Sequence, residues 1–381
     1  MITCAALAIA LLAYTYAGYP LAIGLLARLS PGLRRTERDG SRDDASTDEV
    51  PTVSICLPVF NGSAYLPDKL RSLLEQDYPA DRIEILVYCD GCTDDSEAVA
   101  RSIAASAEAG GRIRILSSPN RSGKPTALNT LGPAATGELL LLNDVRQPLS
   151  RGAVTALVRA MRNPAVGCAT GNLILAGGAG SGVYWRYENW IRAQESAFRG
   201  MVGMTGPIAM IRRADLPPLP QDLILDDVWI PMRLALAGKR VVFVAQAEAH
   251  DAAFEDEREF RRKTRTLAGN YQLFARLPAA LNPFENPIWF ETMSHKILRL
   301  AAPWLLLALA ATSASAALAG AGPATNVMRA LAIGQALFYA AAAVGPRGGR
   351  LAGVARTFVV LNIAAVIGLV RFLTGSQRVT W

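Results

Sequence analysis

The chain has 381 residues, 51% of them hydrophobic, and its 39 basic and 32 acidic side chains give a net charge of +7. A mean hydropathy of +0.23 argues against an ordinary soluble protein, and no stripe of basic residues interleaved with aromatic residues indicates a nucleic-acid partner. The positive charge instead suits contact with anionic lipid, and five cysteines without a paired framework indicate a reducing compartment.

The N-terminal segment is apolar enough to cross a membrane. Residues 1–27 carry no charged side chain, and about 20 apolar residues span the hydrocarbon core of a bilayer. A cleaved signal peptide is the alternative, but the segment lacks a basic start and exceeds the usual apolar length. We therefore predict a retained transmembrane helix at residues 1–29, followed by a polar linker at residues 30–50.

Strands and helices alternate after the linker. The pattern predicts four strands, Val53–Leu57, Ile83–Tyr88, Ile113–Leu116 and Leu139–Leu142, separated by helices at Ala64–Glu75, at about 95–109 and from about Thr126. This alternation is typical of an α/β fold with a mostly parallel sheet. Each strand runs into a loop that contains Asp, Asn, Gly or Lys, so we expect these loops to share one edge of the sheet, where ligands bind.

The fourth predicted strand carries the clearest sign of a ligand site. Four consecutive leucines end on Asn143 and Asp144, as in a strand that is buried on both faces and stops at a carboxylate. Arg146 follows two residues later. We expect Asp144 to face a bound ligand at the strand end.

The preceding loops also carry candidate ligand-binding side chains. The loop Asn120–Pro125 is not a P-loop, because Ser118 and Pro125 break that motif, but Gly123 and Lys124 before a helix suit a diphosphate. A solvated lysine is the alternative for Lys124. We predict that Asp94 caps a helix and that Asp90 contacts the ligand. Cys89 and Cys92 form a C-x-x-C without the second pair that zinc requires.

Taken together, these motifs resemble family 2 glycosyltransferases with the GT-A fold. The resemblance is carried in order by PVFN at 58–61, CDGCTDDS at 89–96, GKPTALN at 123–129, Asp144, GPIAMIRR at 206–213, ILDDVWIP at 224–231 and RRKTRTLAGN at 261–270. It covers about residues 51–300 and is closest in character to the membrane-bound, polysaccharide-synthesising branch. It implies a catalytic GT-A domain at residues 51–276.

The resemblance implies roles for individual residues of this chain. It assigns nucleotide-sugar binding to Pro58, Asn61, Asp90, Gly123, Lys124, Asp144, Arg146, Arg262 and Arg265. Asp144 falls on the first acid of the family's D-x-D motif, which helps bind the donor and a divalent metal, Mg²⁺ or Mn²⁺. Arg146 replaces the second acid. Either Arg146 neutralises diphosphate directly, or metal binds through Asp144 and distant ligands such as His250 and Asp251.

The pair Asp226-Asp227 corresponds to the family's acidic pair, whose second member is the general base. We expect Asp227 to be that base, and Asp226 to cap a helix and contact the acceptor. Thr266 replaces the Trp of the family's Q-x-x-R-W motif, which favours single-sugar transfer over processive extension. Trp185 and Tyr187 are candidates for an acceptor-binding platform, although such aromatic side chains equally suit packing or a membrane surface.

The C-terminal part is again apolar. We predict an interfacial amphipathic helix at residues 277–301, with His295 and Lys296 as interfacial anchors, and three transmembrane helices within residues 302–375. These three helices are expected at about 302–322, 327–345 and 355–375. Basic residues after the first span and before the last one place the catalytic domain in the cytoplasm by the positive-inside rule.

The sequence thus predicts a membrane-anchored inverting glycosyltransferase, a hexosyl- or N-acetylhexosaminyl-transferase that uses a nucleotide sugar, most plausibly a UDP-sugar. Its acceptor is expected to be a membrane-associated glycan or lipid in cell-surface polysaccharide synthesis, with polysaccharide export proteins as possible partners. The alternative is a catalytically silent relative that acts as a membrane scaffold. Arg146 favours the scaffold, whereas Asp90, Lys124, Asp144 and Asp227 oppose it.

Overall fold

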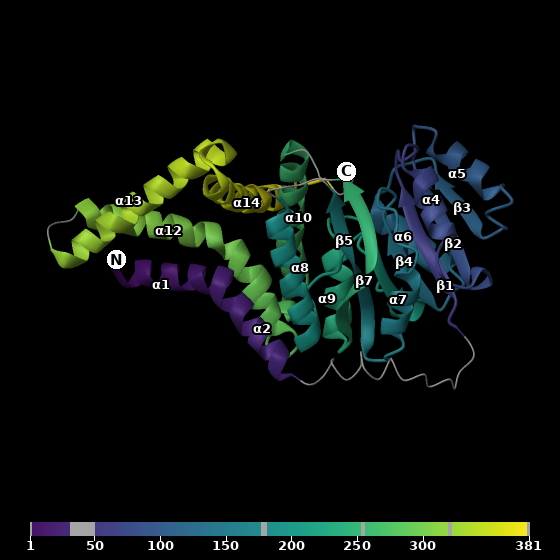
Figure 1. The fold of residues 1–381 in the computed structure, drawn as a ribbon, viewed down its shortest axis with the longest axis horizontal. Coiled ribbons are helices and arrows are strands. Elements are labelled where there is room, and N and C mark those ends of the chain that lie inside the picture. The colour runs from purple at the N-terminus through teal and green to yellow at the C-terminus, as the bar shows by residue number, and fades with distance from the viewer. Residues whose placement is uncertain (1, 31–49, 177–180, 253–255, 319–321, 379–381) are drawn as a thin grey trace.

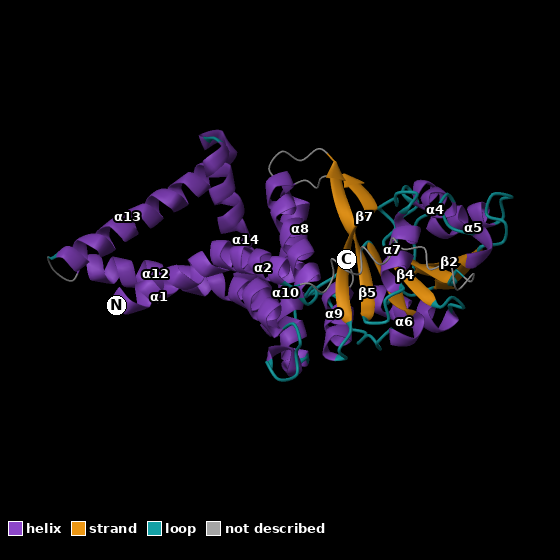
Figure 2. Ribbon diagram, turned by 60° about the horizontal axis from the view of Figure 1, so that its bottom comes forward, coloured by secondary structure: helices purple, strands orange, loops and turns teal. Residues whose placement is uncertain are grey.

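The computed structural model describes residues 2–30, 50–176, 181–252, 256–318 and 322–378. A sheet flanked by helices forms one half of the molecule, and long helices extend away from it in the other half (Figures 1 and 2). The linker predicted at residues 30–50 lies outside the described residues except for its two end positions.

The sheet has seven strands, in the order β3-β2-β1-β4-β6-β5-β7. They are β1 Val53–Val59, β2 Ile83–Asp90, β3 Ile113–Ser118, β4 Leu139–Asn143, β5 Val166–Ala176, β6 Ile208–Arg212 and β7 Arg240–Ala252. Strand β6 runs antiparallel to β4 and β5, and the other neighbouring pairs are parallel. The predicted mostly parallel α/β sheet is therefore confirmed.

Helices cover both faces of this sheet, which explains the uninterrupted apolar run in β4. One face packs against α4 Leu66–Leu74, α5 Ser96–Ala104 and α7 Ala153–Met161, and the other against α6 Lys124–Ala134, α9 Asp226–Leu236 and α10 Asp256–Arg276. Leu141 faces the first set and Leu142 the second, because successive side chains of a strand point to opposite faces. Each buried leucine contributes about 1.5–3 kcal/mol.

Among the described residues, four helices are long and apolar enough to cross a membrane, one N-terminal and three C-terminal. The first joins α1 Ile2–Ala13, a π-turn at Tyr14–Gly18 and α2 Tyr19–Leu29. The second joins α11 Trp289–Glu291, a π-turn at Thr292–Ile297 and α12 Leu298–Leu318. The remaining two are α13 Pro323–Val344, which a 3₁₀ turn extends to Gly348, and α14 Arg350–Leu373.

The helix that leads into the second span is shorter at its start than the predicted residues 277–301. A short 3₁₀ turn occupies Pro278–Leu281, and the helix that starts at Trp289 continues without interruption to Leu318. Its polar residues are directed at α8 Ser181–Phe198, because His295 is buried there against two glutamates. The alternation of polar and apolar residues in this segment therefore reflects packing within the protein.

The long helices are attached to the sheet-containing half of the molecule through α8 and α10 (Figure 1). Gly368 of α14 lies so close to α10 that a Cβ atom there would approach the Ala268 nitrogen to 2.9 Å. Tyr187 of α8 donates a hydrogen bond to the Tyr16 carbonyl of the N-terminal helix at 3.0 Å. Two independent contacts thus hold the sheet domain against the candidate membrane helices.

Candidate active site

Loops at the carboxyl ends of the parallel strands are tied together by Asp90. This carboxylate, buried at the end of β2, accepts hydrogen bonds from the backbone N–H groups of Ser122 at 2.8 Å and Gly123 at 2.7 Å. Gly91 has a φ of +62°, and a Cβ there would meet the Arg121 nitrogen at 2.4 Å. Asp90 thus shapes the loop before α6, while its predicted contact with a ligand stays a prediction.

Asn61 links the first two loops. It has a φ of 47°, its amide donates to Thr93 Oγ1 at 3.0 Å, and its Oδ1 accepts from the Thr93 N–H at 2.9 Å. Asp94 accepts from the Ser96 N–H at 3.0 Å, although α5 begins at Ser96 and Asp95 holds the capping position. Pro58 lies inside β1, opposite Tyr88.

Lys124 lies at the centre of the site. Its ammonium forms ion pairs with Asp144 at 2.8 Å and with Asp226 at 3.0 Å, and only 9% of its side chain is exposed. Burial alone would lower the pKa of Lys124, but the two carboxylates raise it above its usual range. Burial likewise favours a raised pKa for Asp144, and the Lys124 charge outweighs it to give a lowered pKa. Lys124 is therefore not a solvated loop lysine, because it joins α6, the end of β4 and the start of α9.

The two carboxylates of the acidic pair have different surroundings. The prediction that Asp226 caps a helix is wrong, because Leu225 holds the capping position and Asp226 is the first residue of α9, paired with Lys124. Asp227 Oδ1 is buried and has no hydrogen-bond partner among the described residues. Burial, and then the adjacent charge of Asp226, raise the pKa of Asp227 to about 6. Asp227 is therefore the member of the pair that is free to accept a proton.

Asp144 and Asp227 face a common point at Gly206. A Cβ atom built on Gly206 would lie 3.6 Å from Asp227 Oδ2 and 3.8 Å from Asp144 Oδ2. The absence of a side chain at Gly206 leaves the space between the two carboxylates open. The carboxylates of Asp144 and Asp227 therefore lie on the two sides of one small region.

Arg146, at the second position of the D-x-D motif, points toward β7. Its Nη2 pairs with Asp251 Oδ1 at 2.7 Å, and Gln147 Nε2 donates to Asp251 Oδ2 at 2.6 Å. His250 lies 3.5 Å from Glu248. Both oxygens of Asp251 are thus bound by neighbouring side chains, and within the described residues Asp144, His250 and Asp251 do not form a group of metal ligands.

The residues around Asp144 suit a divalent metal only if the phosphates of the nucleotide sugar supply further ligands. Within the described ranges no three His, Cys, Asp or Glu residues are grouped to hold a metal. Asp144 Oδ1 is paired with Lys124, whereas no hydrogen bond to Oδ2 is found among the described residues. Divalent magnesium is commonly held by one or two carboxylates together with substrate phosphates, and Asp144 suits that arrangement.

Two arginines of α10 bring positive charge to the same region. Arg265 donates to the Ile224 carbonyl at 2.8 Å, and its charge lowers the pKa of Asp227 against the larger upward effect of burial. The charge of Arg262 likewise lowers the pKa of Asp144. Arg262 and Arg265, predicted to bind the nucleotide sugar, thus lie close enough to the site to lower the pKa values of its carboxylates.

Lys69 is a site residue that sequence reasoning missed. It is fully buried in α4, and its ammonium donates to Asn143 Oδ1 and to the Gln147 carbonyl, each at 2.6 Å. Burial lowers the pKa of Lys69 to about 7. The helical spacing was the available signal, because Lys69 falls on the same stripe as Leu66, Leu70 and Leu73. Through these two hydrogen bonds Lys69 fixes the loop that carries Asp144.

Trp185 and Tyr187, the two residues predicted to form an acceptor-binding platform, lie in different environments. Tyr187 is bound to the N-terminal helix, as described above, so it serves packing rather than an open platform. Trp185 Nε1 donates to the Leu173 carbonyl at 2.6 Å, and the Arg192 guanidinium lies 5.0 Å from the centre of its ring.

Cys89 and Cys92 are both free thiols, and burial raises the pKa of Cys89 to about 12.

The raised pKa of Asp227 predicts a pH dependence. A general base works as a carboxylate, so we expect the transfer rate to fall as the pH drops through about 6. Asp226→Asn removes a negative neighbour and is expected to move this acidic limb to lower pH. Initial rates between about pH 5 and pH 8 measure the shift. The exposed Asp68→Asn variant is the control, and an unchanged limb in Asp226→Asn would contradict the assignment.

A mostly parallel sheet with the donor loops on its carboxyl edge, and an acidic pair opposite them, defines a nucleotide-sugar transferase domain of the GT-A type. Residues 54–217 match the family model described as Glycosyl transferase family 2. This part of the chain is therefore a family 2 glycosyltransferase domain.

A solved structure and two curated proteins show how far this similarity extends. The mannosyltransferase PcManGT from Pyrobaculum calidifontis, solved in complex with GDP-Man and Mn²⁺, is 25% identical with a TM-score of 0.72, over 97% of this chain and 99% of that one. The N-acetylglucosaminyltransferase of Rhizobium leguminosarum bv. viciae is 32% identical over 45% of this chain and 41% of its own length. The N-acetylglucosaminyltransferase of Rhizobium meliloti (strain 1021) is 29% identical over 46% and 43%. The chain thus spans about two fifths of these curated relatives.

Proposed function

We propose that this protein is a membrane-anchored inverting glycosyltransferase that transfers a sugar from a nucleotide sugar to a membrane-associated acceptor. One observation carries the proposal. Lys124 neutralises Asp144 and Asp226, while Asp227, with a pKa raised to about 6, faces Asp144 across Gly206. Sugar transfer requires a general base for the acceptor hydroxyl and a group that binds the diphosphate of the donor.

The chemistry follows from these positions. The acceptor hydroxyl gives its proton to Asp227 while its oxygen attacks the anomeric carbon of the donor. The diphosphate leaves on the side of Asp144, where the charges of Lys124, Arg262 and Arg265 stabilise the developing negative charge. Attack from the face opposite the leaving group inverts the anomeric configuration. A divalent metal, when bound by Asp144 and the donor, would add to this charge stabilisation.

A UDP-sugar is the first candidate donor, and GDP-mannose is the second. The curated relatives named above are N-acetylglucosaminyltransferases, which supports UDP-N-acetylglucosamine. PcManGT was solved with GDP-Man, and its similarity extends over 97% of this chain, which supports a mannose donor. Thr266, in place of an aromatic residue, favours transfer of single sugars.

The acceptor is proposed to be a lipid-linked sugar or glycan of cell-surface polysaccharide synthesis. Four candidate spans among the described residues, three of which contact the catalytic half, support an acceptor that is presented at a membrane. Basic residues such as Arg28 and Arg356, near the ends of the first and last spans, favour a cytoplasmic catalytic domain.

Metal binding is expected to depend on the nucleotide. Because the protein offers a single carboxylate oxygen at Asp144, we expect Mn²⁺ to bind weakly to the protein alone and tightly in the presence of UDP or GDP. Electron paramagnetic resonance of free Mn²⁺ measures this directly, and Asp144→Asn is expected to abolish the nucleotide-dependent part. Tight binding without nucleotide would contradict the assignment, as would Asp144→Asn binding Mn²⁺ as wild type does.

Transfer of labelled sugar tests the proposed function. Membranes containing the overproduced protein are incubated with labelled UDP-N-acetylglucosamine or GDP-mannose, and the lipid and polysaccharide fractions are then separated. We expect one donor to label a membrane-derived product, and the label to be lost with Asp227→Asn. A silent scaffold would bind a nucleotide sugar without labelling any fraction above the level of membranes that lack the protein.

A further inference from the structure

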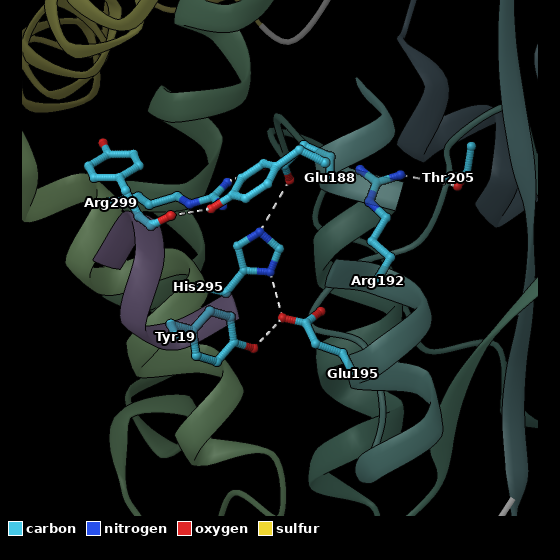
Figure 3. Close-up of polar contacts among 9 residues, drawn as sticks. Tyr19, Glu188, Arg192, Glu195, Thr205, His295 and Arg299 are labelled. Carbon is cyan, nitrogen blue, oxygen red and sulfur yellow. Dashed lines mark hydrogen bonds and ion pairs between the residues drawn. The ribbon is translucent and has the colours of Figure 1, made fainter. Parts of the chain in front are cut away.

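A buried polar cluster joins the catalytic half to the candidate membrane helices. It consists of Tyr19 from α2, Glu188 and Glu195 from α8, and His295 and Arg299 from the helix Trp289–Leu318 (Figure 3). Glu195 Oε1 accepts from Tyr19 at 2.6 Å and lies 2.6 Å from His295 Nδ1. Glu188 pairs with Arg299 and lies 3.2 Å from His295 Nε2. Both carboxylates of this junction cluster are therefore engaged.

Two further cations border the junction cluster without a carboxylate of their own. Arg192 of α8 and Lys296 of the second long helix form no ion pair within the described part of the chain, where Glu188 and Glu195 bind other partners. Both side chains are partly buried. Partial burial of a cation that pairs with no carboxylate costs free energy, and an anion that arrives from outside would offset this cost.

These two cations point at the loop that leads to the general base. Arg192 Nη1 donates to Thr205 Oγ1 at 3.5 Å (Figure 3). A Cβ atom on Gly203 would lie 4.0 Å from Lys296 Nζ and 3.4 Å from the Asp227 carbonyl oxygen. The Lys296 charge also acts on Asp227, lowering its pKa against the larger effects of burial and Asp226. Lys296 is thus near Asp227, at the start of a helix long enough to enter a membrane.

We propose that Arg192 and Lys296 bind a phosphate group of a lipid-linked acceptor, so that the acceptor is a sugar carried on a lipid phosphate or diphosphate. This inference rests on the proposed function, because it places the acceptor hydroxyl at Asp227. The nucleophile is that hydroxyl and not the phosphate, since a phosphate oxygen that is already ionised needs no base. The phosphate holds the acceptor where the membrane helices meet the catalytic domain.

A binding experiment tests the site without relying on turnover. Full-length protein in phosphatidylcholine nanodiscs is saturated with UDP, which occupies the donor's diphosphate position, and is titrated with farnesyl diphosphate or uncharged farnesol. We expect Lys296→Met and Arg192→Gln each to weaken farnesyl diphosphate binding at least about 10-fold, as for a lost charge-assisted hydrogen bond. Farnesol binding is expected to stay unchanged, and Lys296→Arg is expected to retain most of the affinity. Lys239→Met, at a partly exposed lysine far from the cluster in sequence, is expected to behave as wild type.

Three results would overturn the proposal. These are failure of the wild type to bind farnesyl diphosphate, equal loss of farnesol binding in the variants, and affinity unaffected by either substitution. Displacement of the probe by phosphatidylglycerol nanodiscs, equally in the wild type and Lys239→Met, would assign the cations to bilayer headgroups instead. Because no sugar is transferred, failure here is distinguishable from failure of the proposed transferase activity.

Discussion

Asp227→Asn is expected to reduce sugar transfer by about 10²–10⁴-fold, which is the usual contribution of a positioned general base. Asparagine preserves the size of the side chain but cannot take the acceptor proton. Donor affinity is expected to stay within about twofold of wild type, because Lys124, Asp144 and Asp90 are untouched. The opposite assignment, with Asp226 as the base, is disfavoured because Lys124 binds that carboxylate.

Steady-state transfer rates and calorimetric binding of the donor measure this prediction together. Asp68→Asn, on the exposed side of α4, is the matched control and should change neither quantity. Transfer at close to the wild-type rate in Asp227→Asn would remove this residue from the mechanism. A parallel collapse of donor binding would instead give Asp227 a role in holding the nucleotide sugar.

Lys124→Met is expected to abolish transfer and also to destabilise the catalytic domain by about 3–5 kcal/mol, since removal of one partner leaves buried charges uncompensated. Lys124 is the cation shared by Asp144 and Asp226, and both face the same interior region. Its charge also holds down the pKa of Asp227, against burial and the Asp226 charge. The variant is therefore expected to move any residual activity to higher pH.

Thermal unfolding of the purified full-length protein separates these two consequences. The double variant Lys124→Met/Asp226→Asn removes one of the unpaired charges, so it should recover part of the lost stability without recovering transfer. Lys239→Met, at a partly exposed lysine, controls for the loss of a positive charge. A Lys124→Met protein that unfolds and transfers sugar like the wild type would contradict the central position of Lys124.

The parallel half of the sheet and its donor loops could be predicted because they depend on local periodicity. The leucines of β4 and the polar residues at the strand ends indicated a sheet with two covered faces and a ligand edge. The start of α6 was displaced by only two residues, from Thr126 to Lys124, because Pro125 suits the first turn of a helix.

The partners of the charged residues could not be predicted, because they depend on contacts between distant segments. Arg146 pairs with Asp251, 105 positions away, and Lys124 reaches both the end of β4 and the start of α9. The sequence around Asp226 is typical of a helix cap, but in the structure its carboxylate forms an ion pair with Lys124. The polar residues around His295 likewise indicated a helix at the membrane interface, whereas His295 is buried against two glutamates of α8.

The proposed transferase activity is tested by the release of nucleoside diphosphate from the purified full-length protein, measured across a panel of UDP- and GDP-sugars with Mg²⁺ or Mn²⁺. We expect the wild type to turn over one donor, with slow hydrolysis even without acceptor, and Asp227→Asn to bind this donor without releasing its diphosphate. Donor binding without turnover by the wild type, or equal turnover by Asp227→Asn, would contradict this expectation.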